Sequence, residues 1–376
     1  MHVKDLPTPS LILDIERLEK NLNHMAERAQ QLGVQLRPHV KTAKCAEVSK
    51  RATKGQAGGI TVSTLKEAEY FCAHGFEDII YGVGIVPGKM AAIDDIQQKG
   101  ATVRITLDNP EMAHAIVGAA SGLQTNFGVT IEINSGANRG GVLPEDDRLI
   151  EIGQIINKSR NLRIQGVLSH AGHAYLCQNT AAIIDVAEQE RAAVVLAAKR
   201  LEAANIPCAM VSVGSTPTAL FAQHLDGITE MRPGVYTLFD ISQQVLGCCN
   251  DDDIAVSVLA SVINHNEAQD YALVDAGALA LSQDVSTDKF GDSYKYGAVY
   301  DETCENPVAG IRVSGVQQEH GFLSAPTSPF PFDQLPLGSK VRILPIHACM
   351  TAAPYDKYYV VKGNKVIDVW DKLTGW

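Results

Sequence analysis

Eight short β-rich runs alternate with helical stretches between about residue 36 and residue 231 of the 376-residue chain. The runs are Leu36–Val40, Gly59–Ser63, Asp78–Tyr81, Thr102–Leu107, Gly128–Ile133, Gln165–Ser169, Ala209–Val213 and Gly227–Met231. Two of the stretches between them, Thr64–His74 and the Ala-rich Thr180–Asn205, are typical of helices. Regular alternation of strand and helix favours a parallel sheet with helical crossovers. Eight such units predict an α/β fold, a closed (β/α)8 barrel.

After about residue 244 the sequence changes to strands joined by polar or Pro/Gly turns, with no strong helix between them. The expected strands are Ile254–Asn264, Asp270–Ala276, Pro307–Gln317, Lys340–Pro345, Lys357–Lys362 and Lys365–Trp370. Lys362–Lys365 predicts a hairpin turn, and Pro326–Pro336, with four prolines, predicts a loop. This half is expected to be an antiparallel β domain. We place the barrel at residues 14–243 and the β domain at 244–376, with residues 1–13 joining the β domain.

Composition narrows the classes of protein that this chain can be. Hydrophobic residues make up 45% and charged residues 20%, as in globular proteins. The net charge of -11 argues against a nucleic-acid partner. No run approaches the roughly 18 to 20 apolar residues that cross a membrane, and Met1–Leu13 lacks the pattern of a signal peptide. The eight scattered cysteines are expected to be free thiols, which indicates a reducing, cytoplasmic location.

The chemistry of a (β/α)8 barrel collects at the C-terminal ends of its strands. Lys41 directly follows the first strand. An amine that is partly desolvated and close to other cations has a lowered pKa, so it is a better nucleophile for imine formation. The alternative for Lys41 is an ordinary surface lysine at a strand end.

The segment Gly214-Ser215-Thr216-Pro217-Thr218 lies between the seventh strand and a short helix. A glycine backbone, hydroxyl donors and a helix N-terminus can together cradle a phosphate. The alternative is a helix cap, because Ser and Thr cap helices without any ligand.

Two arginines, Arg139 and Arg232, follow other barrel strands. A guanidinium there can bind an oxyanion through its fork of donors. Either arginine alone would more commonly be solvated, but two at barrel mouths favour an anion site.

His347 and Cys349 flank Ala348 in the C-terminal half. On a β-strand, residues i and i+2 point to the same face, and a His nitrogen with a thiolate is a plausible zinc pair. Two protein ligands would leave an open site that water or substrate completes. His170 and His173 could supply another ligand or a proton relay, or they could be hydrogen-bonded loop histidines.

Five segments taken in order resemble the fold-type III pyridoxal-phosphate (PLP) enzymes related to alanine racemase. The segments are Arg37–Thr42, Asn138–Gly141, Gly214–Thr218, Arg232–Tyr236 and His347–Cys349. The branch that the chain resembles most is that of D-serine dehydratase and D-threonine aldolase. The resemblance covers both halves of the chain.

The resemblance implies roles for particular residues. It implies that PLP is bound covalently by Lys41, that its phosphate is held by Gly214, Ser215 and Thr216 with Tyr236, and that Arg139 lies near its phenolic oxygen, Arg232 beside its pyridine nitrogen and Tyr175 close to its ring. His347 and Cys349 match the metal pair of the dehydratases, where zinc or another divalent cation is expected. Aldolases usually carry an aspartate at the second position, so Cys349 favours dehydration.

The function implied is a PLP- and metal-dependent lyase on small D-β-hydroxy amino acids, like D-serine dehydratase, which gives pyruvate and ammonia. A homodimer with shared active sites is also implied. A D-threonine aldolase, which gives glycine and an aldehyde, remains an alternative. An amino-acid racemase also remains an alternative. Its second base would be a tyrosine, and the candidates are Tyr271, Tyr294, Tyr296, Tyr300 and Tyr355. A non-catalytic PLP-binding protein would not need the C-terminal domain, and a barrel metal hydrolase would need more His and Asp ligands.

Overall fold

The computed structural model describes residues 1–290, 294–326 and 328–376, and the chain divides into two compact units. The barrel unit comprises His24–Lys41, Ser49–Gly234 and Trp376. The β unit comprises Met1–Asn23, Thr42–Val48 and Val235–Gly375. Neither unit is one continuous stretch of chain, and helix α1 (Ile15–Gln31) is shared between them.

Eight parallel strands form the sheet of the barrel unit, in the order β2-β9-β8-β7-β6-β5-β4-β3. They are β2 (Gln35–Leu36), β3 (Ile60–Val62), β4 (Asp78–Gly84), β5 (Thr102–Leu107), β6 (Phe127–Glu132), β7 (Leu162–Leu168), β8 (Met210–Val213) and β9 (Glu230–Met231). A parallel bridge between His39 and Thr61 joins the two ends of this order and closes the barrel. The predicted (β/α)8 barrel is confirmed, with all eight strands near their expected places.

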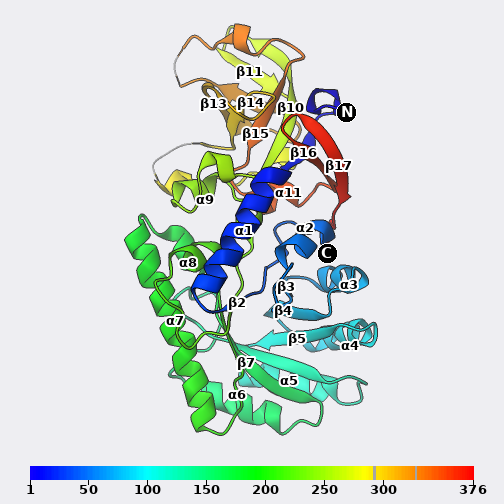
Figure 1. The fold of residues 1–376 in the computed structure, drawn as a ribbon, viewed down its shortest axis with the longest axis vertical. Helices are drawn as coiled ribbons and strands as arrows, with labels where there is room; N and C mark the ends of the chain where they lie inside the picture. Colours follow the sequence, from blue (N-terminus) through cyan, green and yellow to red (C-terminus); the bar gives the residue numbers. More distant parts are fainter. Residues whose placement is uncertain (291–293, 327) are drawn as a thin grey trace. The chain divides into compact units, whose positions relative to one another are not determined.

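Helices lie outside these strands (Figure 1). They are α2 (Ala46–Ala52), α3 (Leu65–Ala73), α4 (Met90–Gln98), α5 (Pro110–Ala120), α6 (Arg148–Asn157), α7 (Thr180–Ala203) and α8 (Thr216–Phe221). Side-chain caps start several of them, because the oxygens of Thr64, Asn109 and Asn179 each accept a backbone N–H of the first turn. The helices predicted over Thr64–His74 and Thr180–Asn205 are confirmed as α3 and α7.

The β unit contains one nine-stranded sheet, in the order β11-β14-β13-β12-β15-β10-β1-β16-β17. Its strands are β1 (Ser10–Asp14), β10 (Val256–Asn266), β11 (Tyr271–Val274), β12 (Ala298–Tyr300), β13 (Pro307–Val316), β14 (Gly321–Ser324), β15 (Lys340–Leu344), β16 (Lys357–Lys362) and β17 (Lys365–Asp371). All described pairs are antiparallel except β1 with β16. Pairing of β10 with β11 closes six strands into a ring. The predicted antiparallel β domain is confirmed.

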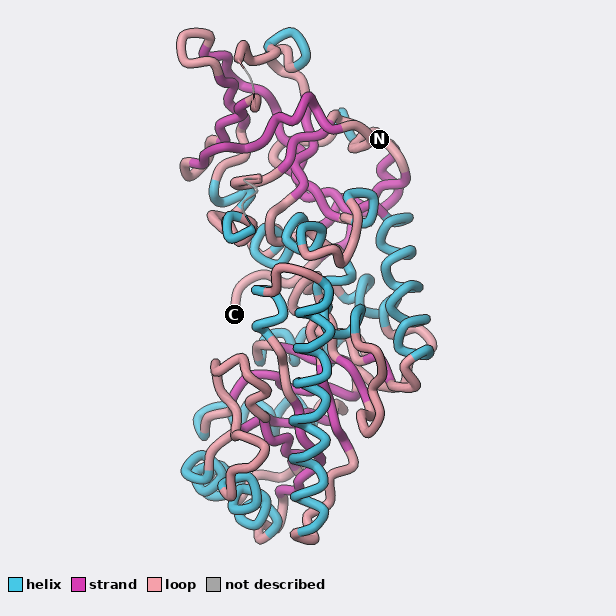
Figure 2. The backbone as a smooth tube through the Cα atoms, turned by 90° about the vertical axis from the view of Figure 1, so that its left-hand side faces the viewer, coloured by secondary structure: helices cyan, strands magenta, loops and turns pink. Residues whose placement is uncertain are grey.

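The helices of the β unit are short. They are α9 (Ile241–Val245), α10 (Ala278–Leu281) and α11 (Ala348–Ala352). Figure 2 distinguishes helices from strands by colour along the whole backbone. The hairpin predicted at Lys362–Lys365 joins β16 to β17, with Gly363 at a φ of 55°. The segment predicted as a loop, Pro326–Pro336, contains only a 3-10 turn at Phe332–Gln334, and residue 327 lies outside the described residues.

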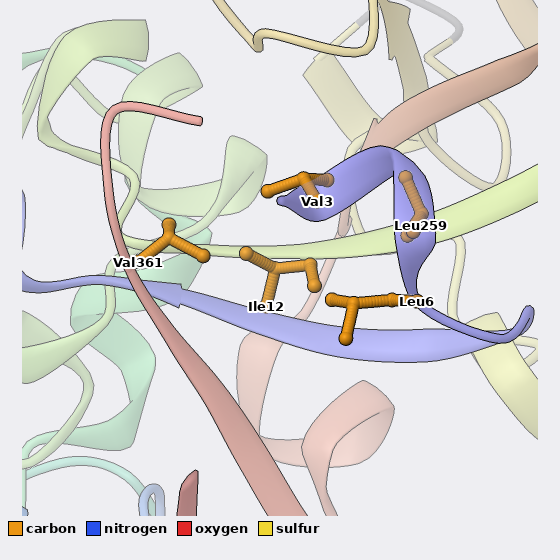
Figure 3. Packing of buried hydrophobic residues seen from close by; sticks show 5 residues of the cluster. All are labelled: Val3, Leu6, Ile12, Leu259 and Val361. Carbon is orange, nitrogen blue, oxygen red and sulfur yellow. The ribbon is translucent and has the colours of Figure 1, made fainter. Parts of the chain in front are cut away.

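The N-terminal segment of the chain packs into the β unit. Val3, Leu6 and Ile12 form one buried cluster with Leu259 and Val361 (Figure 3). Each of the five side chains is at most 1% exposed, and burying such aliphatic side chains stabilises the unit. Among the described residues, no helix is long and apolar enough to cross a membrane.

Candidate active site

A cavity of about 310 Å³ lies at the C-terminal ends of the barrel strands. Its lining belongs to the barrel unit: His39, Lys41, Thr61, Ser63, Gly82, Val83, Gly84, Glu132, Arg139, Leu168, His170, Gly214 and Arg232. Four of the predicted site residues, Lys41, Arg139, Gly214 and Arg232, are therefore brought to one cavity. Its size is in the range of pockets that hold small ligands.

Two histidines flank Lys41 in this cavity. Burial, together with the charges of Lys41 and nearby cations, lowers the pKa of His170 to about 3 and that of His39 well below its usual range. Both rings are therefore neutral at pH 7. His170 Nδ1 lies 2.5 Å from the carbonyl oxygen of Gly214. A carbonyl can only accept, so Nδ1 carries the proton and Nε2 is left as an acceptor.

Arg232 is buried at 6% exposure and held at two points. Its Nη2 donates to the carbonyl of Ser169 at 2.6 Å, and its Nη1 donates to the hydroxyl of Ser212. Arg139 differs, because its side chain is 65% exposed and its Nη2 pairs with Glu132 Oε1 at 3.3 Å. The cavity thus contains one buried guanidinium held at two points and one that is largely exposed.

Gly214 has a φ of 145°, and a Cβ there would lie 2.6 Å from the backbone nitrogen of Arg232. Only glycine fits this close approach. Its N–H donates to Glu190 Oε1 at 3.2 Å. Ser215 caps α8, since its hydroxyl accepts the N–H of Thr218 at 3.2 Å. The cap expected as the alternative is therefore present. The phosphate-binding role of Gly214, Ser215 and Thr216 stays a prediction.

The two tyrosines predicted near the cofactor do not line the cavity. Tyr175 lies in a 3-10 turn, Gly172–Leu176, with its ring centroid 6.4 Å from that of His170. Tyr236 is fully buried in the turn Val235–Thr237 of the β unit, where burial raises its pKa. Their roles stay predictions.

The predicted metal pair lies in the β unit. His347 is the N-cap of α11 and Cys349 lies within that helix, so the assumption that a β-strand places both on one face is wrong. The N–H of Ala348, the first residue of this helix, donates to Asp240 Oδ2 at 2.9 Å. His347 Nδ1 lies 2.7 Å from Asp284 Oδ2, and Cys349 Sγ lies 3.1 Å from the hydroxyl of Thr42, close enough for a hydrogen bond.

Electrostatics at this pair favour a bound cation. Burial opposes protonation of His347, but its hydrogen bonds to Asp284 and Cys349 outweigh this and raise its pKa to about 11. A divalent cation would replace that proton. Because Asp284 bonds Nδ1 of His347, the other ring nitrogen, Nε2, would be left to bind a metal, as in carboxylate–histidine–metal arrangements. Among the described residues, no group of three or more His, Cys, Asp or Glu side chains could hold a metal, so a metal here would keep open positions.

The barrel cavity fits PLP on its own geometry. It holds a lysine, two cationic guanidinium groups and a glycine turn that admits a close ligand. Within the described part of the chain, the buried atoms His39 Nδ1 and Thr61 Oγ1 in its lining have no hydrogen-bond partner. Buried polar atoms are normally paired, so these two indicate a polar ligand.

Sequence inspection missed several of these residues. Thr61, Ser63 and Glu132 line the cavity but were not predicted, and His39 was noted only as part of the segment Arg37–Thr42, without a role of its own. Glu190 lies in the middle of α7, and no motif marks it. Nothing in the sequence showed that Asp284 would meet His347.

Comparisons with known proteins identify the family. The chain matches the family "Alanine racemase, N-terminal domain" over residues 13–241 and the family "Putative serine dehydratase domain" over residues 255–361. D-threo-3-hydroxyaspartate dehydratase of Delftia sp. is 40% identical over 99% of this chain and 98% of that protein. D-serine dehydratase of Dictyostelium discoideum is 32% identical over 100% of this chain and 98% of that protein.

A solved structure of one of these relatives supports the same family. A cysteine-to-alanine variant of D-threo-3-hydroxyaspartate dehydratase, in the metal-free form, superposes with a TM-score of 0.97 at 39% identity, and the match covers 100% of both chains. The predicted family, with its PLP and divalent-metal cofactors, and the predicted enzyme class are confirmed at the level of the family. The chain belongs to the alanine racemase-related family of PLP-dependent enzymes, in the branch of lyases that carry a serine dehydratase domain.

Proposed function

We propose that the chain is a PLP- and metal-dependent lyase that removes water from small D-β-hydroxy amino acids. The observation that carries this proposal is the barrel cavity, where Lys41 lies among two guanidinium groups and two neutral histidines. The similarity to dehydratases of D-threo-3-hydroxyaspartate and D-serine supports the substrate class. D-Serine, the smaller of the two, is the first substrate to test.

In this proposal Lys41 Nζ binds PLP covalently, and Arg139 and Arg232 carry positive charge toward its oxygens and ring. Gly214, Ser215 and Thr216 hold the phosphate, with Tyr236 as a further donor and Tyr175 near the ring. When bound, PLP withdraws electrons from the α-carbon of an amino acid.

The residues around Lys41 control a proton. In this proposal Lys41 Nζ, once released from the cofactor, would take the α-proton of the substrate as a general base. His39 and His170 are neutral, so they add no competing positive charge beside Nζ. The acceptor Nε2 of His170 can hold a donor group of the substrate or cofactor in place.

His347 and Cys349 hold a divalent cation in this proposal, with zinc the first candidate because of the thiolate ligand. When bound, the metal polarises an oxygen of the substrate and makes a β-hydroxyl a better leaving group. Asp284 and Thr42 orient the two ligands through the contacts at 2.7 and 3.1 Å.

We also propose a homodimer with shared active sites and a cytoplasmic location. The family expectation supports the first, and the eight free cysteines support the second. Light scattering of the purified protein would test the dimer.

The function is tested by incubating the purified protein with D-serine, D-threonine and D-threo-3-hydroxyaspartate, with and without a chelator. Assays would follow 2-oxo acid plus ammonia, and glycine plus aldehyde. We expect 2-oxo acid that disappears with the chelator and returns with zinc. Glycine plus aldehyde would replace the dehydratase proposal by an aldolase.

A lysine variant tests whether PLP is attached covalently to Lys41. After borohydride reduction, mass spectrometry of the wild type should place PLP on Lys41. The Lys41→Ala variant should carry no covalent PLP, whereas Lys54→Ala, which changes an exposed lysine of the same unit, should behave as the wild type. Covalent PLP elsewhere, or none in the wild type, would refute the assignment.

A further inference from the structure

A continuous chain of hydrogen-bonded side chains crosses the barrel unit and ends in the active-site cavity. Asp78, the first residue of β4, accepts from Arg37 Nη1 and Nη2 at 2.8 and 3.1 Å. Arg37 Nε donates to Glu230 Oε2 at 2.8 Å. The other oxygen of Glu230 accepts from Ser212 at 2.7 Å, and Ser212 in turn accepts from Arg232. Arg37, Ser212, Glu230 and Arg232 are all buried.

The direction of the bonds at Ser212 is fixed by its single proton. A carboxylate can only accept and a guanidinium can only donate. The Ser212 hydroxyl therefore donates to Glu230, and its lone pairs receive Nη1 of Arg232. The hydroxyl cannot rotate without breaking both bonds. With Nη2 held by the carbonyl of Ser169 at 2.6 Å, the plane of the Arg232 guanidinium is set by two contacts.

The buried positive charge of Arg232 needs a negative charge close to it. Burial lowers the pKa of Arg232, and the carboxylates of Glu230 and Glu190 act in the opposite direction. Arg37 also acts to lower it, and Lys41 and Arg139 line the same cavity. A buried cation among cations is costly unless a counter-charge is close. Glu230 is the largest of these counter-charges, and the Ser212 hydroxyl joins it to Arg232 by hydrogen bonds.

We propose that Glu230 is a positioning residue: acting through Ser212, it fixes the orientation of the Arg232 guanidinium toward the cofactor ring. Glu230 does not line the cavity among the described residues and need not touch substrate. The proposal rests on the proposed function, because it concerns how Arg232 meets PLP.

The test is Ser212→Ala, compared with Ser169→Ala as a matched control. The two serines are 0% and 1% exposed. Ser212 lies in β8, and Ser169 directly follows the neighbouring strand β7. The hydroxyl of Ser169 bonds that of Ser135 at 2.7 Å, whereas Arg232 uses only the backbone carbonyl of Ser169. Both variants lose one buried hydroxyl, but only Ser212→Ala releases the guanidinium.

We expect Ser212→Ala to weaken PLP binding about tenfold, as for losing one hydrogen bond to a charged group, and to move the absorption maximum of the bound cofactor. Ser169→Ala should stay within about twofold, with an unchanged spectrum. Equal behaviour of the two variants, whether both change or neither does, would overturn the proposal. If the wild type binds no PLP at all, it is the proposed function that fails.

A second pair of variants covers a failure of Ser212→Ala to fold. Glu230→Gln keeps the side-chain shape and removes the charge, and it should move the spectrum in the same direction. Asp78→Asn disturbs Arg37 at its other partner and leaves the Ser212 contact intact, so its spectrum should be that of the wild type. A normal spectrum for Glu230→Gln would equally refute the positioning role.

Discussion

Replacing Glu190 by alanine should destabilise the barrel unit strongly, because this carboxylate ties two active-site loops together. Glu190 lies on α7 and is 1% exposed. Its Oε1 accepts the N–H groups of Ala171 at 2.8 Å and Gly214 at 3.2 Å, and its Oε2 accepts the Thr218 hydroxyl at 3.0 Å. The first loop follows β7 and the second follows β8.

The size of the effect follows from the donors left behind. Alanine would leave two buried N–H groups without an acceptor, at roughly 1–3 kcal/mol each. The Thr218 hydroxyl costs little, because it can turn to the carbonyl of Ser215, 3.3 Å away. We therefore expect a loss of about 2–6 kcal/mol. In Glu190→Gln the amide oxygen can keep both N–H bonds, so that variant should lose at most about 1 kcal/mol.

Thermal and urea unfolding of the wild type and both variants would measure this difference. At roughly 2–4 °C per kcal/mol, the alanine variant should melt about 4–24 °C below the wild type. Burial raises the pKa of Glu190 above its usual 4.5. The wild type should therefore lose stability relative to Glu190→Gln as the pH rises from about 4.5 to the folded pKa. An alanine variant as stable as the glutamine variant would refute the reasoning.

Three further predictions concern other parts of the chain. Gly214→Ala brings a Cβ within 2.6 Å of a backbone nitrogen, so PLP affinity, measured by fluorescence titration, should fall at least about tenfold; Gly55→Ala, at a φ of 75° but in open space, should bind PLP normally. Asp284→Asn removes the carboxylate from His347 and should weaken divalent-metal binding about 10–100-fold in chelator competition; unchanged affinity would mean that the 2.7 Å contact does not orient the ligand. Lys372 is buried, and burial lowers its pKa to about 8 from 10.5. Because its folded pKa is depressed, the stability of the wild type relative to Lys372→Met should rise between about pH 8 and 10.5; a difference that is flat in this window would contradict the shift.

The sequence was sufficient to predict the barrel because strand and helix periods alternate without interruption. All eight expected strands occur, and the six strands expected after residue 244 also occur. The strands β1, β12 and β14 were missed. Each lies between two partner strands, and pairing on both sides, which leaves no local pattern in the sequence, sets its position.

The candidate site was predictable only where its residues follow strand ends. Lys41, Arg139, Gly214 and Arg232 do so, and they share the cavity. His347 and Cys349 were predicted as metal ligands on a β-strand, but they lie at the start of a short helix, and their metal role stays a prediction. The first N–H of that helix, from Ala348, is bonded by Asp240, more than one hundred residues away in the chain. Contacts of that range leave no local pattern in a sequence.

The position of β1 has a consequence for the order in which the chain folds during synthesis. Ser10 pairs with Leu259, and Ile12 pairs with Tyr359, almost at the other end of the chain. The barrel strands all lie between residues 35 and 231, so they can assemble while the ribosome is still making the rest. The apolar segment Leu11–Leu13 of β1 can meet its first partner only when β10 has been made, and its second only when β16, near the end of the chain, has followed.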